Sequence, residues 1–203
     1  MKNVNVKKIA AAGLVFLTAT AFIVIVQVYG LDLITLYTNN QNSAGELNAA
    51  MIMLGSNQQA DRRFPVLRIA AISAVRLGKY GEAQEFATEL LNIAPNFPHY
   101  NGDALFDGHT VLGRVALAHG DRETACRELL LAGATPGSPV LNSFGPDMTL
   151  ARGLLFAGES ETVLKYFDQC LRFWKFGEEP IRRWKWMIRY HLPPNFGNNL
   201  VRV

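Results

Sequence analysis

The pattern of hydrophobic and polar positions divides the chain into two parts of different character. An apolar run without any charged residue extends from Ile9 to Val28, and a helix of about 20 residues is long enough to cross the ~30 Å hydrocarbon layer of a bilayer. Beyond this run, Ala- and Leu-rich segments with helical spacing of apolar positions alternate with glycine and proline, without strand-like alternation. The pattern predicts a single N-terminal transmembrane helix followed by an all-α domain.

The basic residues that flank the apolar run predict its orientation in the membrane. Three lysines lie in the first eight residues, whereas no Lys or Arg follows the run before Arg62. Because cytoplasmic flanks carry the excess of Lys and Arg, this asymmetry favours a cytoplasmic amino terminus. We therefore expect a single-pass protein of a bacterial inner membrane whose C-terminal domain lies in the periplasm.

A cleaved signal peptide is the alternative interpretation of the same segment. The residues from Ala19 to Ala21 are small and have the spacing that a leader peptidase requires. A strongly apolar stretch continues directly after Ala21, however, and makes the run too long for an ordinary leader. Retention as an anchor is therefore the favoured prediction.

Charge and cysteine content limit the possible classes of function. The formal net charge is +3, and the three N-terminal lysines account for it, since the rest of the chain has 17 basic residues (20 minus 3) against 17 acidic ones. A neutral domain gives no indication of nucleic-acid binding.

Cys126 and Cys170 do not make a disulfide framework. We expect buried free thiols, with a reversible bridge between the two cysteines as the alternative.

Three segments of the chain align with one another on a shared glycine. The aligned glycines are Gly78, Gly120 and Gly158, which are 42 and 38 residues apart. Each lies between two helical patterns, where a glycine ends a helix in the left-handed conformation without strain from a Cβ atom. The alignment predicts a repeat of helical hairpins.

Several residues of these units match the pattern of a known helical repeat. The matching residues are Ala83, Leu90 and Pro95 in the first unit, Leu112, Gly113, Ala125 and Ala132 in the second, and Leu150, Ala151, Phe167 and Cys170 in the third. On these residues, the segment 64–174 resembles the tetratricopeptide repeat (TPR) family. The resemblance implies about three stacked hairpins, closely packed at small residues, that serve protein–protein contact. Ala87 departs from the family, which has an aromatic residue there. The connections 96–109 and 134–147 are longer than in the family and are predicted to be loops.

The C-terminal pattern completes the predicted domain organisation. An amphipathic helix that ends before Pro193 is expected to cover the last hairpin, because a stacked array otherwise exposes an apolar face. We therefore divide the chain into the cytoplasmic tail and anchor (1–30), a linker with a short helix (31–63), the repeats (64–174), and a capping helix with a C-terminal tail (175–203).

The first helices of the hairpins are predicted to line a partner-binding groove. The residues that project onto this groove are Arg68, Ile72, Arg76, Arg114, Leu117, Arg152, Leu155 and Phe156. Guanidinium groups among apolar side chains suit an extended peptide that carries carboxylates, because arginine offers paired donors in one plane. Pairing of these arginines with acidic residues of neighbouring repeats is the alternative.

Tryptophan and basic residues alternate in the predicted capping helix. The residues that could form a membrane or partner surface are Trp184, Trp186, Arg182, Lys185 and Arg189. Such residues are favourable at anionic lipid headgroups, and an exposed tryptophan also suits a protein partner. The alternative places Trp184 in the core, with the basic residues in solvent.

No arrangement of side chains in the sequence predicts catalysis. Asp103, Asp107 and His109 could in principle hold a metal ion, but aspartates at the start of a helix more often cap it. No nucleophile motif or phosphate-binding loop is present. We therefore expect no enzyme, no metal, no cofactor and no small-molecule substrate.

These observations together predict a membrane-anchored interaction scaffold. The expected role is that of an accessory subunit that stabilises or assembles a larger membrane complex, of the energy-transducing, translocation or cytochrome-assembly type. A transient extracytoplasmic receptor or chaperone that binds peptides through the arginine-lined groove is the alternative. The expected partners are subunits of a membrane complex or extended peptides, together with the bilayer around residues 9–28, and not nucleic acid.

Overall fold

The computed structural model describes residues 41–56, 59–99 and 101–200. The predicted anchor and the alternative leader peptide both lie outside the described residues, so the structure does not bear on them. In the part of the chain that it does describe, no helix combines the length and the apolar character needed to cross a bilayer.

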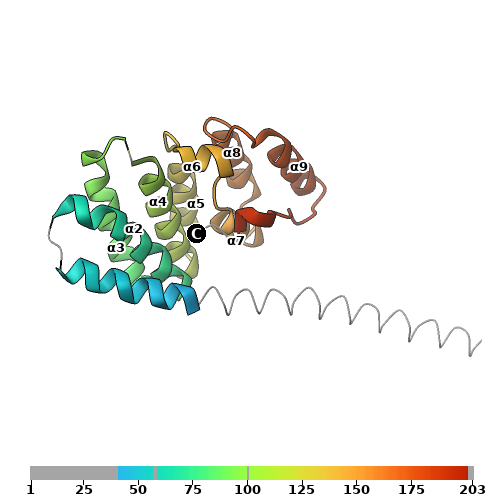
Figure 1. Cartoon of the computed structure of the whole chain (residues 1–203). Helices are drawn as coiled ribbons and strands as arrows, with labels where there is room; N and C mark the ends of the chain where they lie inside the picture. Colours follow the sequence, from blue (N-terminus) through green and yellow to red (C-terminus); the bar gives the residue numbers. More distant parts are fainter. Residues whose placement is uncertain (1–40, 57–58, 100, 201–203) are drawn as a thin grey trace, which may run out of the picture. The chain divides into compact units, whose positions relative to one another are not determined.

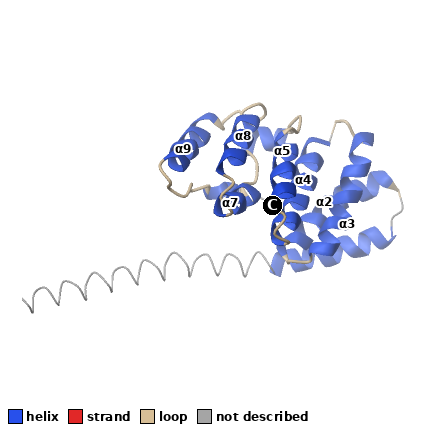
Figure 2. Cartoon of the chain, turned by 180° about the vertical axis from the view of Figure 1, so that it is seen from behind, coloured by secondary structure: helices blue, strands red, loops and turns tan. Residues whose placement is uncertain are grey.

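The described residues form an all-α domain, as predicted, without any strand among them (Figures 1 and 2). A helix over residues 41–56 comes first. The helices that follow are α2 (Ala60–Arg76), α3 (Tyr80–Ile93), α4 (Asn101–Ala118), α5 (Arg122–Gly133), α6 (Pro139–Phe144), α7 (Thr149–Phe156), α8 (Ser160–Cys170) and α9 (Glu178–Arg189), with short 3-10 turns at Ala94–Asn96 and Gly197–Leu200. The pairs α2/α3, α4/α5 and α7/α8 each pack together across a short turn.

The three aligned glycines occupy the turns of these pairs in a left-handed conformation. Their φ angles are 72° at Gly78, 81° at Gly120 and 92° at Gly158. At each turn, the residue after the glycine donates its N–H to the carbonyl five residues earlier in the first helix. This hydrogen bond satisfies a terminal carbonyl of the helix and reverses the chain.

Helix α9 ends in the same way but with a histidine at the left-handed position. His191 has a φ of 57°, and the N–H of Leu192 donates to the carbonyl of Met187 over 2.8 Å. Pro193 and Pro194 then prevent any continuation of the helix. The chain returns from there to α7, where the N–H of Met148 donates to the carbonyl of Asn199 over 2.7 Å.

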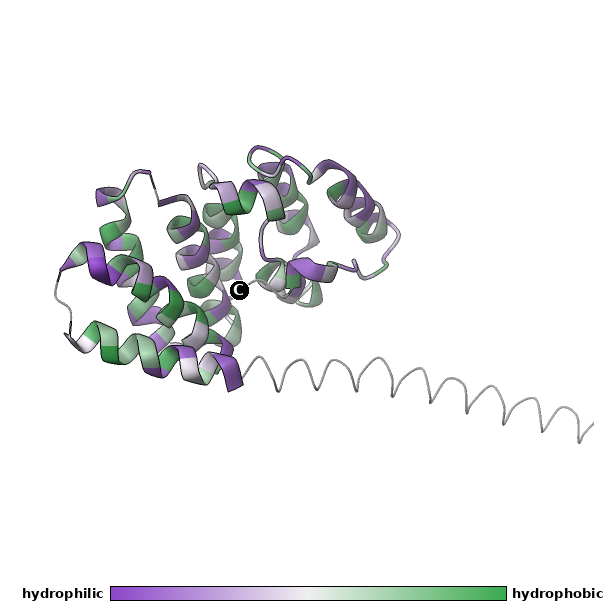
Figure 3. Cartoon of the chain, in the orientation of Figure 1, coloured by the Kyte–Doolittle hydropathy of each residue, from purple (hydrophilic) through white to green (hydrophobic). Residues whose placement is uncertain are grey.

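The core consists of two clusters of buried apolar side chains. One joins the helix 41–56 to α2, α3 and α4, and the other joins α5, α7, α8 and α9. Hydrophobic and hydrophilic positions are intermixed along the drawn helices, as amphipathic helices require (Figure 3). Small residues at the matched repeat positions allow close packing, because a Cβ atom on Gly113 would lie 2.4 Å from Leu150.

Both connections that were predicted to be loops contain helix, so these predictions were wrong in part, while residues 97–99, 134–138 and 145–147 lie outside α-helices. Helix α4 already begins at Asn101, and residues Pro139–Phe144 form α6. Helix α4 packs closely against the second connection at Gly102, because a glycine without a side chain leaves room for the carbonyl oxygen of Gly137. Ser138 caps α6, since its hydroxyl accepts from the N–H of Leu141 over 3.0 Å.

Candidate functional site

The eight residues of the predicted groove lie on the first helix of each pair. Helix α2 carries Arg68, Ile72 and Arg76, α4 carries Arg114 and Leu117, and α7 carries Arg152, Leu155 and Phe156. Arg152 and Phe156 are exposed, and the other six are partly buried. The four arginines differ in their surroundings, and this difference decides which of them can bind a partner.

Arg68 is held by an acidic residue of the neighbouring pair, as the alternative interpretation of the sequence proposed. Its Nε donates to Oδ2 of Asp107 on α4, whose side chain is only 3% exposed. Burial raises the pKa of Asp107 from 3.8 to about 6, although the attraction of Arg68 acts in the opposite direction. Arg68 is therefore a structural residue and is not available to a partner.

Arg76, Arg114 and Arg152, which we call the arginine row, have no such carboxylate. None of the three makes a hydrogen bond or ion pair with another side chain in the described part of the chain. Arg76 and Arg152 lie near enough to Arg114 for their charges to lower its pKa. Burial is the largest cause of the lowered pKa values of Arg76 and Arg114. Burial without a hydrogen-bonded anion is costly for a guanidinium group.

Asp147 lies close to the arginine row, and the sequence analysis did not single it out. Asp147 is 3% exposed, and its Oδ1 accepts from the N–H of Thr149 over 2.7 Å at the start of α7. Burial raises the pKa of Asp147, and the charges of Arg114 and Arg76 lower it in part. Its Oδ2 atom is buried and has no hydrogen-bond partner in the described structure. The carboxylate therefore moderates the positive charge without pairing with it.

Carboxylates act on the arginine row from a distance without pairing with it. Glu46 also acts on Arg76, while its own oxygen accepts from the hydroxyl of Ser73 over 2.9 Å. Asp147 and Asp107 act on Arg76 as well, and Asp147 acts on Arg114, but none of these three carboxylates forms a hydrogen bond with a guanidinium group of the arginine row. Such a site favours an anionic ligand with several acceptor oxygens.

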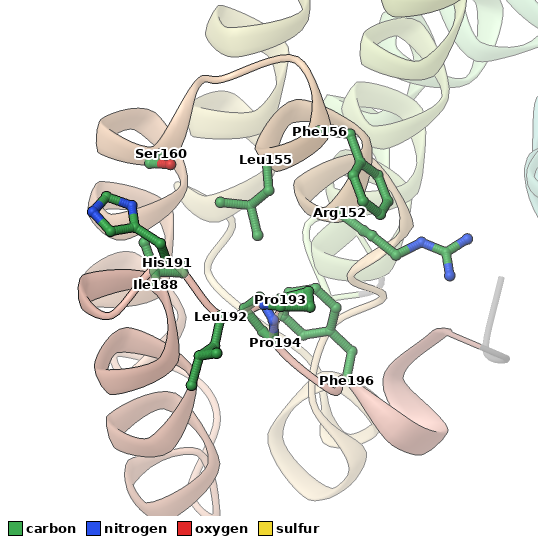
Figure 4. A pocket seen from close by; sticks show the side chains of 10 residues that line it. All are labelled: Arg152, Leu155, Phe156, Ser160, Ile188, His191, Leu192, Pro193, Pro194 and Phe196. Carbon is green, nitrogen blue, oxygen red and sulfur yellow. The ribbon is translucent and has the colours of Figure 1, made fainter. Parts of the chain in front are cut away.

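An apolar pocket of about 430 Å³ adjoins the last member of the arginine row. Arg152, Leu155 and Phe156 of α7 form one wall, and the end of α9 with the returning segment 191–196 forms the other (Figure 4). Phe156 is 79% exposed at this pocket. The groove prediction did not include the residues of α9 or of the returning segment.

The predicted surface of the capping helix is divided between core and solvent. Trp184 is 2% exposed and donates its indole N–H to the carbonyl of Asn195 over 2.8 Å, so it does not belong to a surface. Trp186 is 52% exposed, and its ring centroid lies 4.9 Å from that of Tyr190. The alternative interpretation, with Trp184 in the core, therefore describes this residue.

The basic residues of α9 are partly engaged by carboxylates. Arg182 forms an ion pair with Glu179, and Lys185 forms one with Asp168. Arg189 is exposed. Exposed ion pairs of this kind contribute little to stability. A membrane or partner role for Trp186, Arg182, Lys185 and Arg189 stays a prediction.

The three residues considered for a metal ion each have a different partner. Asp107 pairs with Arg68, Asp103 accepts from the hydroxyl of Ser138 over 2.6 Å, and Nδ1 of His109 lies 2.8 Å from Glu128 Oε2. Within the described ranges, no group of three or more His, Cys, Asp or Glu residues could hold a metal ion.

Both cysteines are free thiols in the structure. Cys170 is buried, and burial raises the pKa of its thiol far above the ordinary range. Cys126 is partly buried, and burial raises its pKa as well. Since the thiolate is the reactive form, neither residue is activated for chemistry.

The chain was compared with family models, curated proteins and solved structures. Neither a family model, nor a curated protein, nor a solved structure matches the chain. The TPR resemblance therefore stays a prediction from the residues that carry it.

Proposed function

We propose that this chain is a membrane-anchored, TPR-like scaffold that holds an acidic segment of a partner protein at the arginine row. The partner is another subunit of a larger membrane complex, which the chain stabilises or helps to assemble. The observation that carries the proposal is that three neighbouring guanidinium groups, two of them partly buried, have no hydrogen-bonded carboxylate among the described residues.

An extended acidic segment suits the spacing of these groups. Arg76, Arg114 and Arg152 come from the first helices of three successive pairs, so a chain that runs across α2, α4 and α7 would meet one arginine on each helix. A carboxylate accepts two N–H groups of one guanidinium at once, which fixes its orientation as well as its charge. The equal numbers of acidic and basic residues beyond the N-terminal lysines disfavour a nucleic acid as the ligand.

The same residues would also serve a transient peptide receptor, the alternative use of the site. The two roles differ in the lifetime of the complex, because a permanent subunit stays bound while a receptor exchanges its ligand. A permanent subunit is expected to co-purify with its partner in a fixed ratio after gentle detergent extraction. A receptor is expected to release the partner within the time of the isolation.

Removal of two members of the arginine row is expected to weaken peptide binding strongly. The full-length chain in mild detergent is incubated with an immobilised library of random octapeptides, and we expect enrichment of peptides that contain two or more Asp or Glu residues. Arg114→Ala combined with Arg152→Ala should weaken binding of the enriched peptides roughly a hundredfold, because each charge-assisted contact contributes about 1.5–3 kcal/mol. Fluorescence polarisation of the labelled peptides gives the dissociation constants.

The matched control is the double variant Arg172→Ala with Arg183→Ala, which removes the same charge from exposed residues outside the arginine row. It should leave the dissociation constants within about twofold, apart from the screened long-range effect of charge. Equal losses in both double variants would reduce the proposal to a general charge effect, and a library without acidic enrichment would refute it.

A further inference from the structure

The pocket beside Arg152 is formed by parts of the chain that lie far apart in the sequence. Leu155 of α7 points into it, and Ile188 near the end of α9 and the segment from His191 to Phe196 complete its walls (Figure 4). Its volume of about 430 Å³ lies in the range of sites that enclose a small molecule or a large side chain.

Apolar groups dominate the lining of the pocket. Leucine, isoleucine, phenylalanine and proline side chains contribute most of the lining residues. Phe156 is 79% exposed at the edge, so an apolar group that enters the pocket would remove apolar surface from water on both partners. At about 25 cal/mol per Å² of apolar surface, this burial favours an apolar occupant.

The wall that the returning segment forms is held in place by the core and by its own backbone. Phe196 is 2% exposed, and its ring centroid lies 4.9 Å from that of Trp184. Pro193 and Pro194 fix the backbone of the same segment, and His191 holds the left-handed turn at the end of α9. A preformed pocket costs little conformational entropy on binding.

Arg152 connects the pocket with the arginine row. Its aliphatic stem lies along the pocket beside Phe156, while the guanidinium group points away from the pocket (Figure 4). A ligand that fills the pocket and extends past Phe156 therefore meets a cationic group outside it. This combination selects an occupant with an apolar group on one side and a carboxylate on the other.

We propose that the pocket binds one bulky apolar side chain, such as leucine or phenylalanine, of the acidic partner segment. This inference rests on the proposed function. It adds an apolar residue to the acidic residues that the proposed function requires in the partner segment. An extended chain advances about 3.3 Å per residue with alternate side chains on the same side. The apolar anchor and the carboxylates that contact Arg152 and Arg114 are therefore expected on the same side of the partner segment.

The experiment compares enrichment from the octapeptide library between the full-length chain and its Phe156→Ala variant. With the unmodified chain, we expect Leu, Met or Phe at one position and Asp or Glu at other positions of the same peptide. Phe156→Ala should remove the preference at the apolar position and retain the acidic preference. Binding of the enriched peptides should fall about tenfold, which corresponds to about 1.4 kcal/mol.

Phe176→Ala is the matched control, because Phe176 is also a strongly exposed phenylalanine, at 71%, and lies outside the pocket. It should change neither preference, and circular dichroism should show unchanged helix content in both variants. Acidic enrichment without any apolar preference would overturn the pocket proposal and leave the proposed function intact. The absence of acidic enrichment would overturn both.

Discussion

Replacement of Arg68 by methionine is expected to lower the free energy of unfolding by up to about 3 kcal/mol at pH 8, by about 1 kcal/mol at pH 7 and by much less near pH 5. The variant keeps the aliphatic volume of the side chain but leaves the carboxylate of Asp107, 3% exposed, without its cation. A buried charge that loses its partner is strongly destabilising. Near pH 5 the carboxyl is largely protonated in the native state and does not need the cation.

The direction of this pH dependence follows from the raised pKa of Asp107. Its pKa is 3.8 in an ordinary environment and about 6 in the native protein, so between these values the native state binds more protons than the unfolded state. The contribution of Asp107 to stability therefore falls as the pH rises from about 4 to 6, with a slope of up to about 1.4 kcal/mol per pH unit. Loss of Arg68 raises the pKa further and extends the fall to higher pH.

Urea denaturation of both proteins between pH 5 and pH 8 measures this difference. Arg62→Met is the matched control, since Arg62 is an exposed arginine of the same helix. That variant should change the free energy of unfolding by less than about 0.5 kcal/mol at every pH. An Arg68→Met penalty of the same size at pH 5 and pH 8 would show that the guanidinium group does not act through Asp107.

Local signals in the sequence were sufficient to predict the helix pairs. A glycine that must adopt a positive φ is visible in the sequence, and Gly78, Gly120 and Gly158 all do so. The sequence was also sufficient to predict that Trp184 is buried and Trp186 exposed. Trp184 shares its helical face with Ile181 and Ile188, whereas Trp186 lies on the opposite side of the helix.

The candidate site depended on contacts that no local pattern contains. Asp107 pairs with Arg68 across 39 positions of the sequence, and Asp147 approaches Arg114 from a connection that was predicted to be a loop. The pocket depends on a chain segment that returns from α9 to α7. Helical periodicity therefore placed four arginines on the first helices. It could not show that Arg68 forms an ion pair with Asp107 while the three arginines of the arginine row form none in the described part of the chain.

The turn that carries Asp147 depends on a glycine whose substitution is expected to be severely destabilising. Gly145 has φ 80° and ψ 173°, a region of backbone conformation that is essentially restricted to glycine. A Cβ atom there would also lie 2.4 Å from the ring of Trp174, which is 6% exposed. Backbone strain and displacement of a buried indole together predict that Gly145→Ala lowers the free energy of unfolding by about 3–5 kcal/mol.

Gly78→Ala tests a positive φ without the clash, because Gly78 has φ 72° but no atom within 4 Å of a built Cβ. It should cost only the strain of a left-handed alanine, about 1–2 kcal/mol. Thermal and urea unfolding, followed by circular dichroism, measure both variants. Since domains of this size are stable by about 5–15 kcal/mol, the Gly145→Ala chain should unfold at much lower urea or accumulate poorly, whereas Gly78→Ala stays folded. An equal loss in the free energy of unfolding at the two glycines would mean that the indole of Trp174 can move aside freely. The contact with Trp174 would then not stabilise the turn before Asp147.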